Sequence, residues 1–61
     1  MAATIELYAD KKGEYRWRLR HQNGNIIADS GEGYKTKASA LNGIESVKNN
    51  APTATIEDQT A

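Results

Sequence analysis

The segment YRWRLR, residues 15–20, carries the clearest strand pattern in this chain. Its apolar residues Tyr15, Trp17 and Leu19 alternate with arginines, so the pattern repeats every two residues. That period predicts a β-strand with one apolar face and one basic face. Because an apolar strand face must be covered, the strand needs neighbours and a second layer.

Turn signals on both sides of this strand predict two hairpins. The segment 10–13, DKKG, reads as a turn with a three-residue loop, and Asn23-Gly24 is a strong hairpin signal that suggests a two-residue turn. Ile5 and Leu7 alternate with polar residues before the first turn, and an apolar run follows the second. We therefore expect strands near residues 3–10, 14–22 and 25–30, joined as an antiparallel meander.

The two turns also set the pairing of the strands. Arg18 is expected to lie between Glu6 on one side and Asp29 on the other, an opposite-charge row of the kind that favours a register. Ile27 falls on this charged face, beside Arg20. The apolar pairs of the same register are Leu7 with Trp17, Ile5 with Leu19, and Leu19 with Ala28.

After Gly33 the period changes from two to 3.6. Thr36 is a suitable N-cap, an apolar stripe follows at helical spacing, and Pro52 ends the pattern. Residues 36–50 are therefore predicted to form a helix and residues 53–57 a short last strand. The expected fold is α+β, an antiparallel β-sheet in the order β-β-β-α-β packed against one α-helix. The expected core consists of Ile5, Leu7, Trp17, Leu19, Ile26, Leu41, Ile44, Val47 and Ile56.

Length and composition limit the chain to one domain, residues 1–61, with an ordered core at about 3–57 and a tail at 58–61. The 61 residues include no cysteine and one histidine, which argues against a disulfide, a metal site or a cofactor. Eight basic residues balance eight acidic ones, unlike an unspecific nucleic-acid binder. The sequence shows neither a signal peptide nor a membrane-spanning run, so we expect a cytoplasmic protein. A core this small leaves a partner subunit as the remaining stabilising device.

Several segments resemble the YegP-like family of small bacterial proteins of unknown function. The resemblance covers residues 5–56 and is carried by YRWRL at 15–19, by NG at 23–24, by YKTK at 34–37 and above all by GIESVKNN at 43–50. It implies a small sheet-plus-helix module that many members carry twice in tandem, whereas this chain has one copy. By similarity, two chains would pair to reproduce the two-copy arrangement. Ile5 and Trp17 stand where the family usually shows phenylalanine, and no activity follows from the resemblance.

The basic face of the central strand is the first candidate site. Arg16, Arg18 and Arg20, with Tyr8 nearby, have the residue types that hold phosphates and stack a base. The competing interpretation is a solvated face whose charges are paired by Glu6 and by an acidic residue of the third strand. We favour the second interpretation because the register supplies those partners.

Other candidates are structural in our interpretation. Gly43, inside the expected helix, suggests a close approach of Trp17 or of a partner chain. Tyr34 either covers the sheet edge or presents its hydroxyl in a groove. The segment 31–33, GEG, is too short for a phosphate loop. His21 and Ser30 do not form a triad in the expected register, so we expect no enzymatic activity and no catalytic residue.

The sequence therefore favours a small structural or interaction module that acts as a homodimer, with an unknown ligand. Ile27, Tyr8 and the free edge of the sheet are the expected parts of the interface. The alternative hypothesis is nucleic-acid or phosphate-ligand binding through the arginine face.

Overall fold

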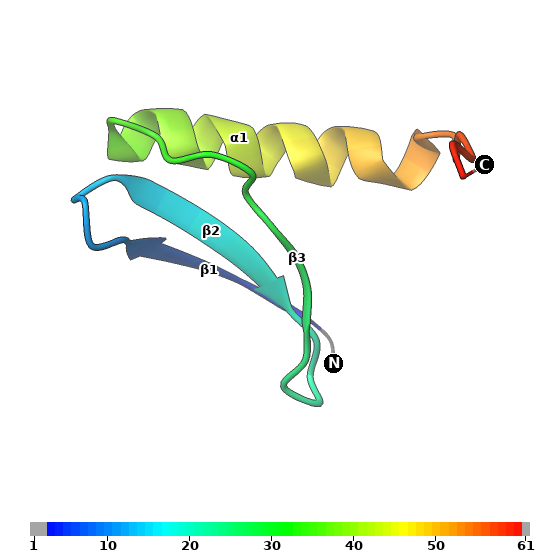
Figure 1. Cartoon of the computed structure of the whole chain (residues 1–61), viewed down its shortest axis with the longest axis horizontal. Helices are drawn as coiled ribbons and strands as arrows, with labels where there is room; N and C mark the ends of the chain where they lie inside the picture. The colour runs from blue at the N-terminus through cyan, green and yellow to red at the C-terminus, as the bar shows by residue number, and fades with distance from the viewer. Residues whose placement is uncertain (1–2, 61) are drawn as a thin grey trace.

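The computed structural model describes residues 3–60, so Met1, Ala2 and the last residue of the predicted tail, Ala61, lie outside the described residues. One antiparallel sheet with the strand order β1-β2-β3 lies under a single helix (Figure 1). The elements in chain order are β1 (Thr4–Ala9), β2 (Tyr15–Arg20), β3 (Ile26–Asp29), α1 (Lys37–Asn50) and the short 3-10 helix η1 (Ala51–Thr53).

The first hairpin has the predicted register, with Glu6 opposite Arg18 and Leu7 opposite Trp17. Its loop spans residues 11–13, as expected. The N–H of Gly13 donates to the carbonyl of Asp10 at 3.0 Å, and Gly13 adopts a φ of 84°. Glycine enters this left-handed region without the steric cost of a Cβ atom, which is why it closes the loop.

The second hairpin differs from the prediction of a two-residue turn. It repeats the geometry of the first: the N–H of Gly24 donates to the carbonyl of His21 at 2.8 Å, and Gly24 has a φ of 96°. The loop therefore spans three residues, 22–24. A bulge beside Arg20 absorbs the extra residue, so that Arg20 pairs with Ile26 and not, as predicted, with Ile27. Beyond the bulge the predicted pairs are restored, including Arg18 with Asp29.

The chain leaves β3 along the edge of β2. The N–H of Ser30 donates to the carbonyl of Trp17 at 2.9 Å, and Tyr34 and Tyr15 exchange two backbone hydrogen bonds of 2.8 Å. Thr36 is the N-cap of α1, as predicted, because its Oγ1 accepts a hydrogen bond from the N–H of Ser39 at 3.1 Å. These contacts hold the start of α1 above the first hairpin (Figure 1).

The core is smaller than the sequence suggested. Trp17, Ala40 and Ile44 are the buried apolar residues, while Ile5, Leu7, Leu19 and Val47 are half-buried. Ile26, Leu41 and Ile56 were predicted in the core and are 52%, 46% and 96% exposed. Helix α1 packs on β2, whereas the residues of β3 and Leu41 of the helix stay exposed.

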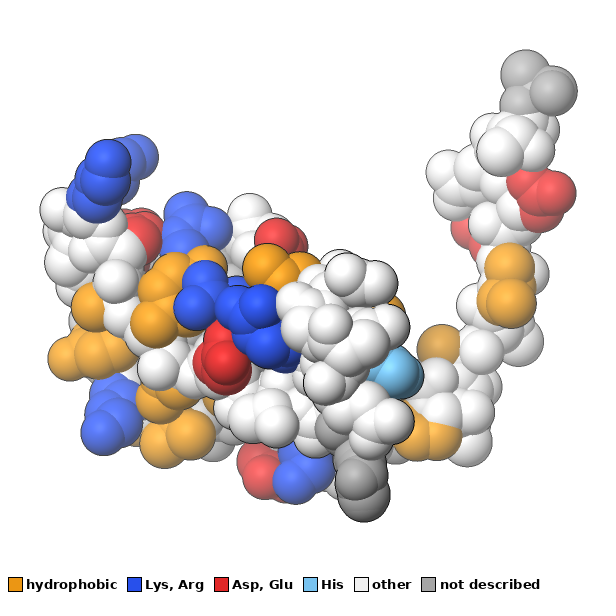
Figure 2. All heavy atoms as spheres, turned by 90° about the horizontal axis from the view of Figure 1, so that it is seen from below, with side chains coloured by type: hydrophobic (Ala, Val, Ile, Leu, Met, Phe, Trp, Pro, Cys, Tyr) orange, Lys and Arg blue, Asp and Glu red, His pale blue; other side chains and the backbone are white. Residues whose placement is uncertain are grey.

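The predicted last strand at 53–57 is also wrong for the described chain, since residues 54–60 contain no strand. Pro52 lies in η1, after which Ala54 is extended with φ −69° and ψ 137°. The segment then runs away from the body of the molecule (Figures 1 and 2). Residues 53–57 alternate as a strand does, but no strand of the described chain lies beside the segment to pair with it.

Candidate functional site

The arginine face lies on the open side of the sheet. Trp17 points toward α1 and is buried, so the alternating side chains of Arg16, Arg18 and Arg20 point to the other side. Figure 2 looks onto this side and shows basic and acidic side chains gathered near its centre. Each of the three side chains is about one-third exposed, at 31–33%.

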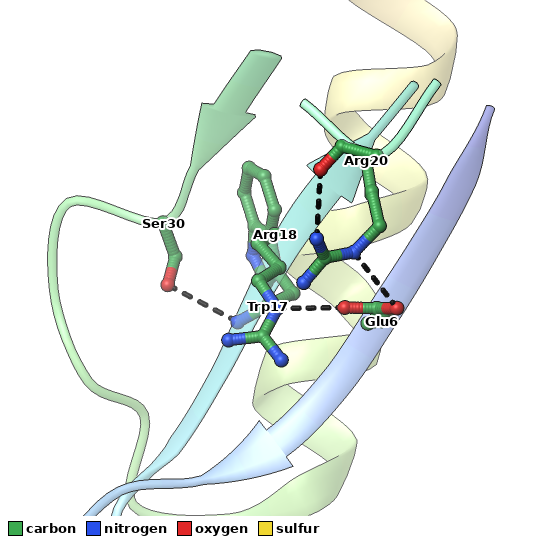
Figure 3. A network of polar contacts seen from close by, with 6 residues as sticks. Glu6, Trp17, Arg18, Arg20 and Ser30 are labelled. Carbon is green, nitrogen blue, oxygen red and sulfur yellow. Dashed lines mark hydrogen bonds and ion pairs between the residues drawn. The ribbon is translucent and has the colours of Figure 1, made fainter. Parts of the chain in front are cut away.

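Every arginine of this face has a carboxylate partner at its Nε atom. The Nε of Arg18 donates to Oε1 of Glu6 at 2.7 Å, and the Nε of Arg20 donates to Oε2 of the same residue at 3.2 Å (Figure 3). The Nε of Arg16 donates to Oδ2 of Asp10 at 2.7 Å. Glu6 thus bridges two arginines, and Asp10 joins the third to the first hairpin loop.

These pairs stabilise the charged forms of Glu6, Asp10, Arg16 and Arg18. The pKa of Glu6 lies below its ordinary value because its carboxylate accepts hydrogen bonds from Arg18 first and Arg20 second. The pKa of Asp10 is lowered chiefly by its hydrogen bond from Arg16. In the reverse direction, Asp10 raises the pKa of Arg16 and Glu6 raises that of Arg18. The face therefore carries fixed, mutually compensating charges near neutral pH.

Tyr8 completes the arginine face. The guanidinium carbon of Arg18 lies 4.4 Å from the centroid of the Tyr8 ring, a cation–π contact. Asp29, predicted as the second partner of Arg18, lies opposite it in the register but forms no ion pair with it in residues 3–60. The solvated, paired face favoured from the sequence is present, although Glu6 supplies more of the pairing than expected.

Tyr34 and Gly43 form a separate contact on the helix side. A Cβ atom at Gly43 would lie 2.9 Å from Cζ of Tyr34 and closer still to its hydroxyl oxygen. The predicted close approach at Gly43 is thus real, but Tyr34 makes it and Trp17 does not. A residue larger than glycine at this position would have to displace the tyrosine ring.

The remaining candidates do not join either group. Ile27 lies in the exposed strand β3 and is 56% exposed. Ser30 is buried, and its Oγ accepts a hydrogen bond from the N–H of Trp17 at 3.2 Å (Figure 3), while Nδ1 of His21 accepts one from the N–H of Asn23 at 3.2 Å. Both side chains thus serve local backbone geometry. Within the part of the chain that the structure describes, we find no pocket and no cluster of metal-ligating side chains.

Sequence reasoning missed two contacts on the arginine face. The pair of Arg16 with Asp10 depends on the tight first loop, which folds the aspartate back toward the strand. The contact of Arg20 with Glu6 is diagonal across the two strands. Diagonal neighbours lie within reach of long side chains, so a search beyond directly opposed residues would have found it.

None of the helices in residues 3–60 has the length and apolar character needed to cross a membrane.

Comparison with known proteins places the chain in one family. The model of the domain of unknown function DUF1508 matches residues 10–58. The chain therefore belongs to the DUF1508/UPF0339 family, the YegP-like proteins, whose function is unknown.

Two relatives and one solved structure illustrate the similarity. The chain is 56% identical to the UPF0339 protein Atu5359 of Agrobacterium fabrum, with 92% of this chain and 89% of that protein covered. It is 58% identical over 52 residues to the UPF0339 protein in the ptx operon 5'region of Stutzerimonas stutzeri, covering 85% of this chain but 46% of that protein, so it spans about half that relative's length. A solution structure of a protein from Haloferax volcanii is 57% identical and superposes with a TM-score of 0.87, covering 92% of this chain and 93% of the other.

Proposed function

We propose that this protein is a non-catalytic interaction module that works as a homodimer. One observation carries the proposal: the chain exposes too much surface for its mass. A compact monomer of its mass, 6.7 kDa, exposes about 3,900 Å², whereas this chain exposes 4936 Å². Its radius of gyration of 12.9 Å likewise exceeds the roughly 10.5 Å of a compact chain of 61 residues.

The excess has the size that a partner subunit would cover. It amounts to about 1,000 Å² on the same scale, and a stable dimer buries about 800 Å² on each partner. Among residues 3–60, the large apolar side chains that are exposed are Ile26, Ile27, Leu41 and Ile56. Association that removes such apolar side chains from water stabilises the dimer.

The C-terminal segment, residues 54–57, supports a second copy as the occupant. Ala54 and Ile56 alternate with Thr55 and Glu57, the pattern of a half-buried strand, yet Ile56 is 96% exposed. Strand β1 has β2 on one side only, so its other edge offers free backbone groups. In a dimer, the C-terminal segment 54–57 of one chain can therefore pair as a strand with the free edge of β1 in the other chain.

The two sides of helix α1 differ, and this difference favours placing the partner's C-terminal segment at the β1 edge of the sheet. Tyr34 fills one flank of the helix at Gly43. Leu41 lies two residues earlier, about 200° around the helix, and is 46% exposed. In the proposed dimer, the partner's Ile56 packs beneath Leu41, and Ile27 forms a second part of the interface. Tyr8 is left out, since its ring already packs against Arg18.

The test compares three variants by sedimentation velocity. Ile27→Asp and Ile56→Asp should each give a monomer with a lower melting temperature than the wild type. Thr55→Asp places the same charge on the opposite face of the same segment and should leave the dimer intact. Equal behaviour of Ile56→Asp and Thr55→Asp, or a wild-type monomer, would contradict the proposed interface.

A further inference from the structure

We infer that the arginine face binds an acidic peptide segment through the terminal nitrogens of Arg16 and Arg18. The ion pairs of Arg16 and Arg18 both use the Nε atom of the arginine, at 2.7 Å in each case. In the described part of the chain, the hydrogen bonds from Arg16 and Arg18 to carboxylates leave from Nε, and their Nη groups donate none to a carboxylate or a carbonyl, although the Arg18 side chain also contacts Tyr8. Arg20 differs because its Nη1 donates to the carbonyl of Gly24 at 2.8 Å.

The hydrogen bonds from Nε hold the guanidinium groups in place and leave their Nη donors available for a ligand. A guanidinium presents five N–H donors in a planar fork, and two parallel donors match the two oxygens of a carboxylate. Asp10 anchors the Arg16 side chain, whereas Arg18 is held by Glu6 and by the Tyr8 ring. Side chains that are already ordered lose less entropy on binding, so the two forks are prepared for an oxyanion.

The charges of the face select a peptide over a nucleic acid. Three arginines share the open side of the sheet with the carboxylates of Glu6 and Asp10, and with Asp29 opposite Arg18. A polyanionic backbone would meet these carboxylates along its length and be repelled. Isolated carboxylates on a peptide avoid most of that repulsion and need only the Nη groups.

The spacing of the arginines defines the peptide. Arg16 and Arg18 are two residues apart on one strand, which corresponds to about 6.7 Å. Acidic residues two apart on an extended peptide have the same separation and the same facing. The proposed ligand is therefore an extended segment of the type acid-x-acid, presented by another protein.

The test is an NMR titration that follows the Nε–Hε resonances of the arginines at constant ionic strength. The probe is the peptide acetyl-Glu-Thr-Glu-amide. The control is acetyl-Glu-Glu-Thr-amide, which has the same net charge, but its two glutamates are adjacent and therefore point to opposite sides of an extended peptide. We expect the matched peptide to bind at least about five-fold more tightly, as for the gain of one charge-assisted contact. Arg18→Lys keeps the charge but loses the fork, and should remove this preference. Lys35→Gln, a charge change on the loop before α1, should not.

Three results would overturn the inference. Equal affinity for the two peptides would show that only charge is sensed, and an unchanged preference in Arg18→Lys would exclude the fork. Tighter binding of a single-stranded oligonucleotide, with an affinity that falls steeply with salt, would assign the face to nucleic acid instead. The sedimentation behaviour of each variant is measured in parallel, so a failed homodimer and a failed peptide site are distinguished.

Discussion

Strands β2 and β3 are neighbours in one sheet, yet they are packed very differently. Every residue of β2 is buried or half-buried, whereas all four residues of β3 are exposed. The difference arises because α1 covers β2, and the loop that leads into α1 pairs with Tyr15 beyond the end of β3. The hairpin and the helix thus form a packed half, while β3 and the C-terminal segment form an open half that a partner would complete.

The largest expected effect is at the centre of the packed half. Trp17→Ala removes one of the few buried apolar side chains and should destabilise the protein by about 3–5 kcal/mol, measured by urea denaturation. Trp17→Phe keeps one aromatic ring in the core, leaves a smaller cavity, and should therefore cost clearly less than Trp17→Ala. At concentrations where the chain is monomeric, Ile27→Ala should cost less than about 1 kcal/mol. Similar losses for Trp17→Ala and Ile27→Ala would remove the distinction between the two halves.

The contact between the helix and the loop before it gives a smaller effect. Gly43→Ala forces a methyl group against Tyr34, which should cost about 1–3 kcal/mol against a gain in helix propensity of about 1 kcal/mol. In a Tyr34→Ala background the same substitution should become neutral or stabilising. A double-mutant cycle by thermal denaturation measures this coupling, and additive effects would show that the two residues do not interact.

The open face of the sheet should contribute little to stability. Arg16→Gln and Arg20→Gln should each change the free energy of unfolding by at most about 0.5 kcal/mol, because exposed ion pairs contribute little. Arg18→Gln should cost more, since it loses both Glu6 and the Tyr8 ring. Chemical denaturation ranks the three variants, and equal losses would contradict the structure.

The same face predicts how stability depends on acid. The folded-state pKa values of Glu6 and Asp10 lie below the ordinary values of 4.5 and 3.8. Their contribution to stability is therefore complete above these values and is lost as the pH falls through the lower folded values. Glu6→Gln removes one of the carboxyl groups that is protonated in acid. The melting temperature of this variant should therefore fall less steeply than that of the wild type between roughly pH 5 and pH 2, the range in which paired carboxylates lose their charge. An unchanged profile would indicate that Glu6 is not held by its two arginines.

The comparison also shows which parts of the fold the sequence can specify. Period-two alternation and the first turn predicted the register of β1 and β2, because opposed charges and apolar pairs agreed with loop length. The second loop was predicted one residue too short, since Asn-Gly suits both a two-residue turn and a three-residue loop, and the bulge beside Arg20 conceals the difference.

The errors in the predicted core have a common cause. Ile26, Leu41 and Ile56 are apolar and correctly phased, but phase does not reveal whether a covering layer exists. Tyr34 at Gly43 was missed for a similar reason, because a loop residue can fill a helix surface that periodicity assigns to the sheet. A missing layer within one chain is itself informative, and here it led to the proposed dimer.

The proposed homodimer is tested most directly by the molecular mass of the wild-type chain in solution, measured by sedimentation equilibrium over a range of concentrations. We expect a mass of twice the 6.7 kDa of one chain, and a melting temperature that rises with protein concentration as mass action requires. A mass of one chain throughout, together with a melting temperature independent of concentration, would show that the open half needs no partner and that the protein is a monomer.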